Sequence, residues 1–144
     1  MTAGITMRDA RLDDCESVFA WNCAPEVRAL SGDPRIIELA EHVRWYQRRL
    51  TAGTMWIVED AGAPVGVIRL DPDDDVTKIS IALAPKARGR GIGRRAIAAA
   101  CAAWAQPVDA TIRVGNAASR ACFEACGFRL ISVTDDLVTY RWSP

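Results

Sequence analysis

The sequence lacks the ligands and motifs on which several function classes depend. It contains one histidine, and its five cysteines form no CxxC pair, so the usual nitrogen and sulfur ligands of a zinc site cannot be assembled. No GxxxxGK(S/T) stretch occurs, which excludes a P-loop. Apolar runs stay below the ~18 residues that a membrane span needs, and no signal-peptide pattern is found. We therefore expect a cytoplasmic protein with reduced thiols and no bound metal.

The chain also lacks an excess of charge of either sign. Its 18 basic residues balance 18 acidic ones, so net charge gives it no general affinity for nucleic acid or membranes. With 144 residues it has the length of one ordinary domain, and we expect a single domain over residues 1–144. Positive charge is nevertheless concentrated locally, which favours a small anionic ligand over a polyanion.

Residues 78–104 are the most informative stretch of the sequence. Apolar and polar residues alternate from Lys78 to Leu83, which predicts a strand, and Pro85 ends it because proline cannot donate to a β-ladder. A glycine-rich turn over residues 88–93 follows. A helix then runs to about residue 104, with apolar residues at helical spacing: Gly93, Ile97, Ala100, Cys101 and Trp104.

Basic residues crowd this turn and the first turn of the helix: Lys86, Arg88, Arg90, Arg94 and Arg95. A helix N-terminus is the positive end of the helix dipole, where each cation costs about 0.3–1 kcal/mol. An anion bound there explains the cluster, because glycines and free N–H groups at a helix N-terminus form a phosphate site. A dinucleotide fingerprint also fits residues 91–96, but it requires an acidic residue that ends the next strand, and Asp109 precedes that strand.

The remaining sequence alternates between strand and helix patterns. Apolar or alternating runs bounded by turn residues predict strands at 5–8, 55–59, 65–70, 111–114, 128–134 and 137–142. Helical spacing predicts helices at 13–22, at 36–50, ended by Gly53, and at 117–125, where Asn116 is placed to cap the first turn. Residues 24–35 are expected to form a loop or short helix, and the acidic segment 71–75 a solvated turn.

Two motifs in this frame resemble those of the GNAT superfamily of N-acetyltransferases. Arg88-Gly89-Arg90-Gly91-Ile92-Gly93 is similar to its acetyl-CoA-binding turn, Q/R-x-x-G-x-G/A, and residues 116–128 are similar to its second motif, N-x-x-A/S-x-x-x-Y-E-x-x-G-F. The resemblance implies a mixed α/β (α+β) fold, with a central twisted mixed sheet of about seven strands flanked by about four helices. In this fold two neighbouring strands splay apart and hold acetyl-CoA, and the predicted order of elements is the one the fold requires.

The resemblance also implies which residues bind acetyl-CoA. In the family, backbone groups at the end of the first splayed strand grip the pantetheine arm and the acetyl carbonyl, and the motif asparagine contacts the same arm. The matching cofactor-binding residues are Leu83, Ala84, Arg88, Gly89, Arg90, Gly91, Ile92, Gly93, Arg94, Asn116, Ser119 and Phe123.

Phe123 departs from the family pattern, which often has tyrosine there as the general acid that protonates the CoA sulfur. A thiol of pKa ~8.5 is already a fair leaving group, so acetyl transfer survives without that acid. The substitutes that the sequence leaves open are Tyr140, Tyr46, Cys122, Cys126 and an ordered water. We expect catalytic roles for Tyr140 and for His42, the one side chain with an ordinary pKa near neutrality. The alternative is an acetyl-CoA-binding sensor without activity.

The N-terminal third suggests the acceptor. Its residues resemble the pattern W-N-x(3)-E-x-R…S…H-x-x-W of N-acetyltransferases that act on nucleotide-linked amino sugars in pseudaminic acid pathways. The resemblance implies substrate-binding roles, by stacking and by phosphate binding, for Trp21, Asn22, Arg28 and Trp45, although each tryptophan could equally be a core anchor. Because acetyltransferases of protein N-termini share parts of the pattern, a protein N-terminus or another small amine is the alternative acceptor. We expect a small-molecule amine as partner, no nucleic acid and no membrane, and leave a homodimer open.

Overall fold

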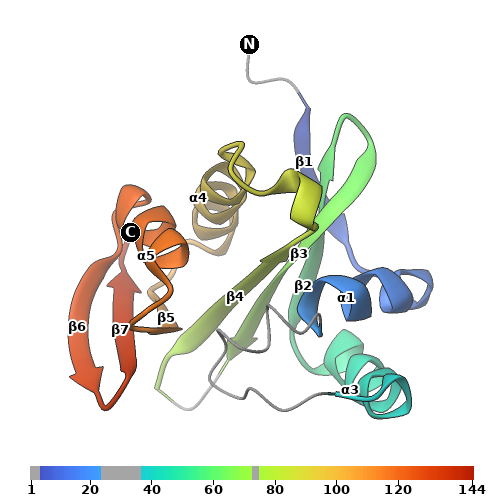
Figure 1. Ribbon diagram of the computed structural model, residues 1–144, viewed down its shortest axis with the longest axis horizontal. Helices are drawn as coiled ribbons and strands as arrows, with labels where there is room; N and C mark the ends of the chain where they lie inside the picture. The colour runs from blue at the N-terminus through green and yellow to red at the C-terminus, as the bar shows by residue number, and fades with distance from the viewer. Residues whose placement is uncertain (1–3, 24–36, 73–74) are drawn as a thin grey trace.

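The computed structural model describes residues 4–23, 37–72 and 75–144. Seven strands form one sheet in the order β1-β2-β3-β4-β5-β7-β6 (Figure 1). The strands are β1 (Ile5–Asp9), β2 (Thr54–Asp60), β3 (Ala63–Pro72), β4 (Thr77–Leu83), β5 (Val108–Arg113), β6 (Arg129–Thr134) and β7 (Leu137–Trp142). The α-helices of the described residues are α1 (Cys15–Asn22), α3 (Leu39–Ala52), α4 (Ile92–Trp104) and α5 (Ala117–Ala125). The expected mixed α/β architecture and the order of its elements are confirmed.

The strands β4 and β5 separate along most of their length. They are the parallel neighbours in a sheet whose other pairs are antiparallel, and α4 makes the crossover between them. Their paired residues are Thr77 with Val108 and Lys78 with Asp109, at the start of both strands. Beyond these pairs β4 continues to Leu83 while β5 diverges toward β7, as Figure 1 shows. The splayed strand pair implied by the sequence resemblance is therefore present.

Different helices cover the two halves of the sheet. In Figure 1 α1 and α3 lie beside β2–β4, whereas α5 lies beside β5 and β7. The register places the side chains of Val67, Arg69, Ser80 and Ala82 on one face, toward α1 and α3. The alternate residues Ile79, Ile81 and Leu83 lie on the other face, where α4 packs. The alternation seen in the sequence is thus the alternation of two covered faces.

Element boundaries differ from the predictions at a few places. Helix α3 begins at Leu39 instead of residue 36, because the preceding Glu38 has an extended backbone (φ −82°, ψ 152°), and it ends before Gly53 as predicted. Strand β3 extends through Pro72, so Asp71 lies in the sheet and not in a solvated turn. Strand β5 runs over Val108–Arg113, earlier than the predicted 111–114. The predicted loop or short helix at 24–35 lies outside the described residues.

Two absences concern the described residues alone. None of their helices is long and apolar enough to cross a membrane. No group of three metal-ligating side chains occurs in the described part of the chain.

Candidate functional site

The separation of β4 and β5 opens a cleft of about 1140 Å³. Its walls are Ile79–Leu83 of β4, Ala110–Ile112 of β5, the N-terminal turn of α4 and the inner side of α5. One end reaches α1 and α3, where Arg69 of β3 completes it. We call this space the central cleft, and we call the part bordered by α1 and α3 its acceptor end.

Among the described residues, the edge of β4 that faces the central cleft has no partner strand beyond Lys78. The N–H of Ala84 donates to the carbonyl of Val65 on β3 (2.8 Å), so residues 84 and 65 form a hydrogen-bonded pair. Because such pairs alternate along an antiparallel ladder, Ile81 and Leu83 direct their N–H and C=O groups away from β3, into the cleft. The carbonyl of Leu83 there accepts a bond from Arg88 Nε at 3.3 Å.

 
Ala84 has a different environment from the one that the sequence suggested. Besides the N–H bond to Val65, the carbonyl of Ala84 accepts from Ala87 N at 2.9 Å, so both of its backbone groups are used within the fold. Ala84 is buried and does not border the central cleft. The expected cofactor contact at Ala84 is therefore not supported, and we expect Ile81 to make it beside Leu83. The direction of the β4 hydrogen bonds, which the sequence does not reveal, decides between the two.

The turn before α4 presents open backbone to the cleft. Gly89 (φ 73°) and Gly91 (φ 76°) adopt left-handed conformations that favour glycine, and Gly91 is the N-cap of α4. Apart from its chain neighbours, a Cβ added to either glycine would meet no atom of the described residues within 4 Å. The first N–H groups of α4 have no partner within the helix and lie beside this open space. A ligand phosphate therefore has both the room and the donors that it needs.

Gly93 has a different function from its neighbours. A Cβ at this position would lie 3.4 Å from Cys122 Sγ and 3.4 Å from Leu83 Cδ1. Gly93 therefore allows α4 to approach α5 and β4 closely, in addition to bordering the cleft. A larger residue there would disturb packing before it disturbed a ligand.

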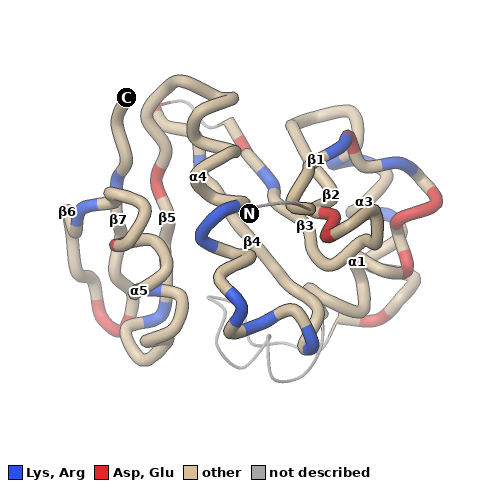
Figure 2. The backbone as a smooth tube through the Cα atoms, turned by 90° about the horizontal axis from the view of Figure 1, so that it is seen from above, with Lys and Arg blue, Asp and Glu red and all other residues tan. Residues whose placement is uncertain are grey.

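The arginines of the turn divide into two groups. Figure 2 shows basic residues following one another along the turn and the first turn of α4. Arg88 and Arg94 border the central cleft. Arg90 instead donates to Asp60 at the end of β2 (2.9 Å), so its expected contact with the cofactor is not supported. Arg95 donates to the carbonyls of Arg90 and Gly91, which fixes the turn against the helix.

The second motif brings three side chains to the opposite wall. Asn116 Oδ1 accepts from the N–H of Ser119 (3.2 Å), which confirms the predicted cap of α5. Asn116, Ser119 and Phe123 all border the central cleft. The Phe123 ring packs edge-on against Phe128, with centroids 4.9 Å apart, so it is a rigid apolar part of the wall.

Tyr140 lies outside the central cleft, and the expected catalytic role is not supported. Its hydroxyl donates to Glu124 Oε2 (2.7 Å) and accepts from Arg120 Nε (3.0 Å), beneath α5. The side chain is 1% exposed, so it cannot reach a ligand sulfur. The reason is that β7 pairs with β5 on the side away from the gap.

The other substitutes for the missing acid can be sorted in the same way. The hydroxyl of Tyr46 donates to the carbonyl of Arg11 (2.6 Å), and the thiol of Cys126 donates to the carbonyl of Arg94 (3.3 Å). Of the four substitute side chains, Cys122 alone borders the cleft. Burial raises the pKa of the Cys122 thiol, so it stays protonated at neutral pH.

His42 is a packed residue between α1 and α3. Its Nε2 donates to the carbonyl of Cys15 (3.1 Å), and its ring packs against Phe19, Trp45 and Tyr46. Burial lowers the pKa of the imidazole, which keeps it neutral. Although His42 lies along the acceptor end, only 1% of it is exposed. These contacts support a structural role that joins the two helices, and they do not support the expected general base.

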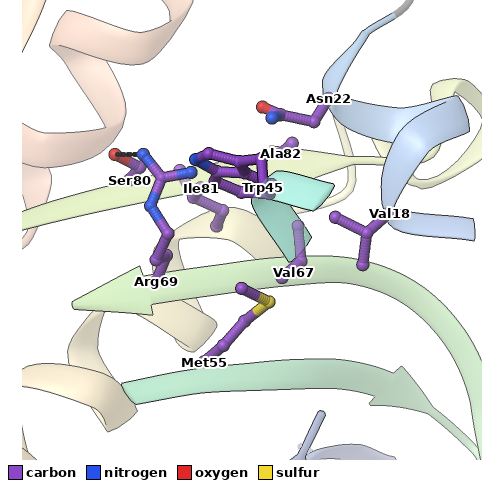
Figure 3. Close-up of a pocket in the computed structure, with 9 residues that line it drawn as sticks. All are labelled: Val18, Asn22, Trp45, Met55, Val67, Arg69, Ser80, Ile81 and Ala82. Carbon is purple, nitrogen blue, oxygen red and sulfur yellow. Dashed lines mark hydrogen bonds between the residues drawn. The ribbon is translucent and has the colours of Figure 1, made fainter. Parts of the chain in front are cut away.

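The acceptor end contains some of the expected substrate-binding residues and one that the sequence did not reveal. Asn22 and Trp45 border it, whereas Trp21 is buried in the core and Arg28 lies outside the described residues. The additional residue is Arg69 of β3, whose guanidinium carbon lies 5.0 Å from the centroid of the Trp45 ring (Figure 3). The sequence signal that could have pointed to Arg69 is its position as a lone charged residue within the apolar run Val65–Leu70.

The comparisons with known proteins agree with this geometry. A family model described as an acetyltransferase (GNAT) domain matches residues 5–129. No curated protein matches the chain. Among solved structures, a domain from Methanocaldococcus jannaschii is similar at 21% identity and a TM-score of 0.84, with 97% of this chain and 98% of that chain covered.

Two further solved structures were determined with ligands. A spermidine N-acetyltransferase from Vibrio cholerae, in complex with CoA and spermine, has 18% identity and a TM-score of 0.82, with 97% and 94% of the two chains covered. A protein from Salmonella typhimurium, determined with its cofactor acetyl-CoA, has 20% identity and a TM-score of 0.74, with 97% of this chain and 94% of that chain covered. At these identities the likeness concerns the fold.

Proposed function

The chain belongs to the GNAT acetyltransferases, and from that premise we propose that it transfers the acetyl group of acetyl-CoA to a primary amine by direct attack in a ternary complex. The observation that carries this proposal is the gap between β4 and β5, which opens at one end onto the N-terminus of α4. A ligand in this gap would meet backbone donors along β4 and phosphate-binding groups at the turn. The opposite end leaves room for an amine.

The described residues fit acetyl-CoA. The open N–H groups at Gly91 and the first turn of α4 suit its pyrophosphate, with Arg88 and Arg94 adding positive charge. The backbone groups of Ile81 and Leu83 suit the amides of the pantetheine arm, as an added strand would. When bound, acetyl-CoA supplies an acetyl group activated as a thioester.

The residues of the cleft favour direct transfer over a covalent enzyme intermediate. A nucleophilic cysteine needs thiolate character, and burial raises the pKa of Cys122, the thiol on α5 that faces Gly93 of α4. The N–H of Ile81, which lies farther from the phosphate-binding turn than Leu83, can donate to the thioester carbonyl oxygen as negative charge develops on it, while the backbone of Leu83 suits the pantetheine arm. Phe123 supplies no proton, and a leaving thiol of pKa ~8.5 does not require one.

For the acceptor we propose the amino group of a nucleotide-linked amino sugar. The support is the pattern shared by the N-terminal third, together with the positions of Asn22 and Trp45 at the acceptor end. Trp45 offers an aromatic face of the kind that stacks on a sugar or base. The alternatives are a protein N-terminus or another small amine, and, because of Phe123, a sensor that binds acetyl-CoA without turnover.

A panel of amines tests this proposal. The protein is incubated with acetyl-CoA and nucleotide-linked amino sugars, free amino sugars, polyamines or peptides, and released thiol is measured. The highest kcat/KM for a nucleotide-linked amino sugar is the expected result. A peptide as the best substrate would replace the acceptor while the reaction stands, and acetyl-CoA binding without turnover of any amine would favour the sensor.

A further inference from the structure

Arg69 forms part of the floor of the acceptor end. It borders both the central cleft and a small adjoining pocket beneath Trp45, which has space of about 10 Å³, close to that of one water molecule. Figure 3 shows the guanidinium beside the Trp45 ring, with Asn22 on the adjoining wall. The Arg69 side chain remains 24% exposed, so a ligand in the cleft can reach it.

The Arg69 guanidinium is hydrogen-bonded to the protein through Nε and Nη2, whereas its Nη1 edge is available to a ligand. Its Nε donates to Asp71 Oδ2 (2.6 Å), and its Nη2 donates to Ser80 Oγ (3.3 Å). Among the described residues, Nη1 has no hydrogen-bond partner. These two contacts and the Trp45 ring fix the orientation of the fork, so that binding an anion would cost little side-chain entropy.

Among the described residues, the side chains around Arg69 carry an excess of positive charge. Asp71 accepts bonds from both Arg49 and Arg69, so one carboxylate is shared by two guanidiniums. Arg48 and Glu41 add one charge of each sign to the same end of the cleft. Burial, and then the charge of Arg49, lowers the pKa of Arg69 to about 10, which leaves it a cation at neutral pH in a positive surrounding. An anionic group in the cleft would relieve this excess.

We propose that Arg69 selects acceptors that carry an anionic group, a phosphate or a carboxylate, near the amine to be acetylated. The inference rests on the proposed acetyl transfer and specifies its substrate class. Arg69 binds the anion through its open Nη1 edge, while Trp45 packs against the adjoining apolar part of the substrate. The same positive surrounding disfavours polyamines, because a second ammonium group would be brought close to a half-buried guanidinium.

Matched acceptor pairs test the proposal with the wild-type protein. Glucosamine 1-phosphate is compared with the methyl glycoside of glucosamine, and glycine with glycinamide, by thiol release from acetyl-CoA. We expect kcat/KM to favour the anionic member of the pair that fits the cleft by at least about tenfold, the lower end for a hydrogen bond to a charged group. Equal values, or higher values for the neutral members, would overturn the proposal.

Variants then assign the preference to Arg69. Arg69→Gln should raise KM for the anionic acceptor by roughly 10- to 150-fold, and by a clearly larger factor than it raises KM for the matched neutral acceptor. Arg69→Lys should restore part of the preference, since it keeps the charge and loses the fork. Arg44→Gln is the control, because it removes the same charge from an exposed position on α3 that does not border the cleft. A preference that survives in Arg69→Gln would exclude this role.

Two measurements separate failure of this inference from failure of the proposed reaction. Thermal melts and acetyl-CoA affinity show whether Arg69→Gln is folded and binds the cofactor. Calorimetry of glucosamine 1-phosphate with the CoA-bound protein measures the anion contact even without turnover. Loss of this binding in Arg69→Gln, but not in Arg44→Gln, supports the inference; equal binding by both variants and the wild type refutes it.

Discussion

Replacement of Gly91 by alanine separates the ligand-binding function of this glycine from its backbone conformation. Gly91 has φ 76°, and a Cβ there would meet no atom within 4 Å in the described part of the chain, its two neighbours in sequence excepted. The change therefore creates no clash inside the protein, but it imposes a left-handed conformation on alanine, which costs roughly 1–2 kcal/mol. It also places a methyl group where the backbone is expected to meet the ligand pyrophosphate.

Gly62 provides the matched control. It has φ 85° in the turn between β2 and β3, and its Cβ would likewise meet nothing within 4 Å. Gly62→Ala and Gly91→Ala should therefore lose similar free energies of unfolding, measured by denaturant titration. Only Gly91→Ala should also lose affinity for acetyl-CoA, because Gly62 does not border the central cleft.

The expected loss can be expressed in two assays. Losing one hydrogen bond to a charged phosphate costs about 1.5–3 kcal/mol, which weakens Kd by roughly 10- to 150-fold in calorimetry. At an acetyl-CoA concentration near 100 times the wild-type Kd, the ligand stabilises the wild type by about 2.7 kcal/mol. A variant with about 100-fold weaker binding retains only ~0.4 kcal/mol of this, so the ligand-induced rise in Tm almost disappears.

One result would refute the reasoning. If Gly91→Ala loses as much stability as Gly62→Ala yet binds acetyl-CoA within about threefold of the wild type, close approach of the ligand to this backbone is not required. The pyrophosphate of acetyl-CoA would then have to bind at a place other than this turn.

Two further predictions concern the residues whose expected catalytic roles the structure does not support. Burial lowers the pKa of His42 below its ordinary value of 6.5. Below pH 6.5 the unfolded chain therefore binds a proton at this histidine that the folded chain does not yet bind. The stability that neutral His42 contributes is thus complete above pH 6.5 and is lost as the pH falls below it. Melts between about pH 7 and 5 should therefore show a steeper decline for the wild type than for His42→Gln, whose kcat should fall by less than the ~10²-fold typical of a lost acid–base group. Tyr140→Phe should lower the free energy of unfolding by about 0.5–1.5 kcal/mol, the net value of a typical hydrogen bond, because the exposed Glu124 can bond to water instead; kcat should be unchanged. A fall in kcat of about 10²-fold at constant stability would show that Tyr140 is the general acid.

Local chemistry was sufficient for much of the fold. Glycines and arginines at residues 88–93 predicted a phosphate-binding turn, since backbone freedom and helix charge are properties of neighbouring residues. Asn116 caps α5, and Gly53 ends α3, for the same reason. The order of strands and helices followed from periodicity, because the spacing of apolar residues reports which face of an element is covered.

Tertiary structure alone decided which groups face the central cleft. The N–H of Ala84 is used by Val65, which leaves Ile81 and Leu83 open, because hydrogen-bond direction alternates along β4 and depends on its partner. Tyr140 lies beneath α5, and His42 is enclosed by rings of α1 and α3, since the position of a side chain depends on the elements packed over it. Arg69 meets Trp45 only because β3 and α3, distant in sequence, pack together. Sequence determined the cofactor turn, whereas the packing of separate elements determined the acceptor end.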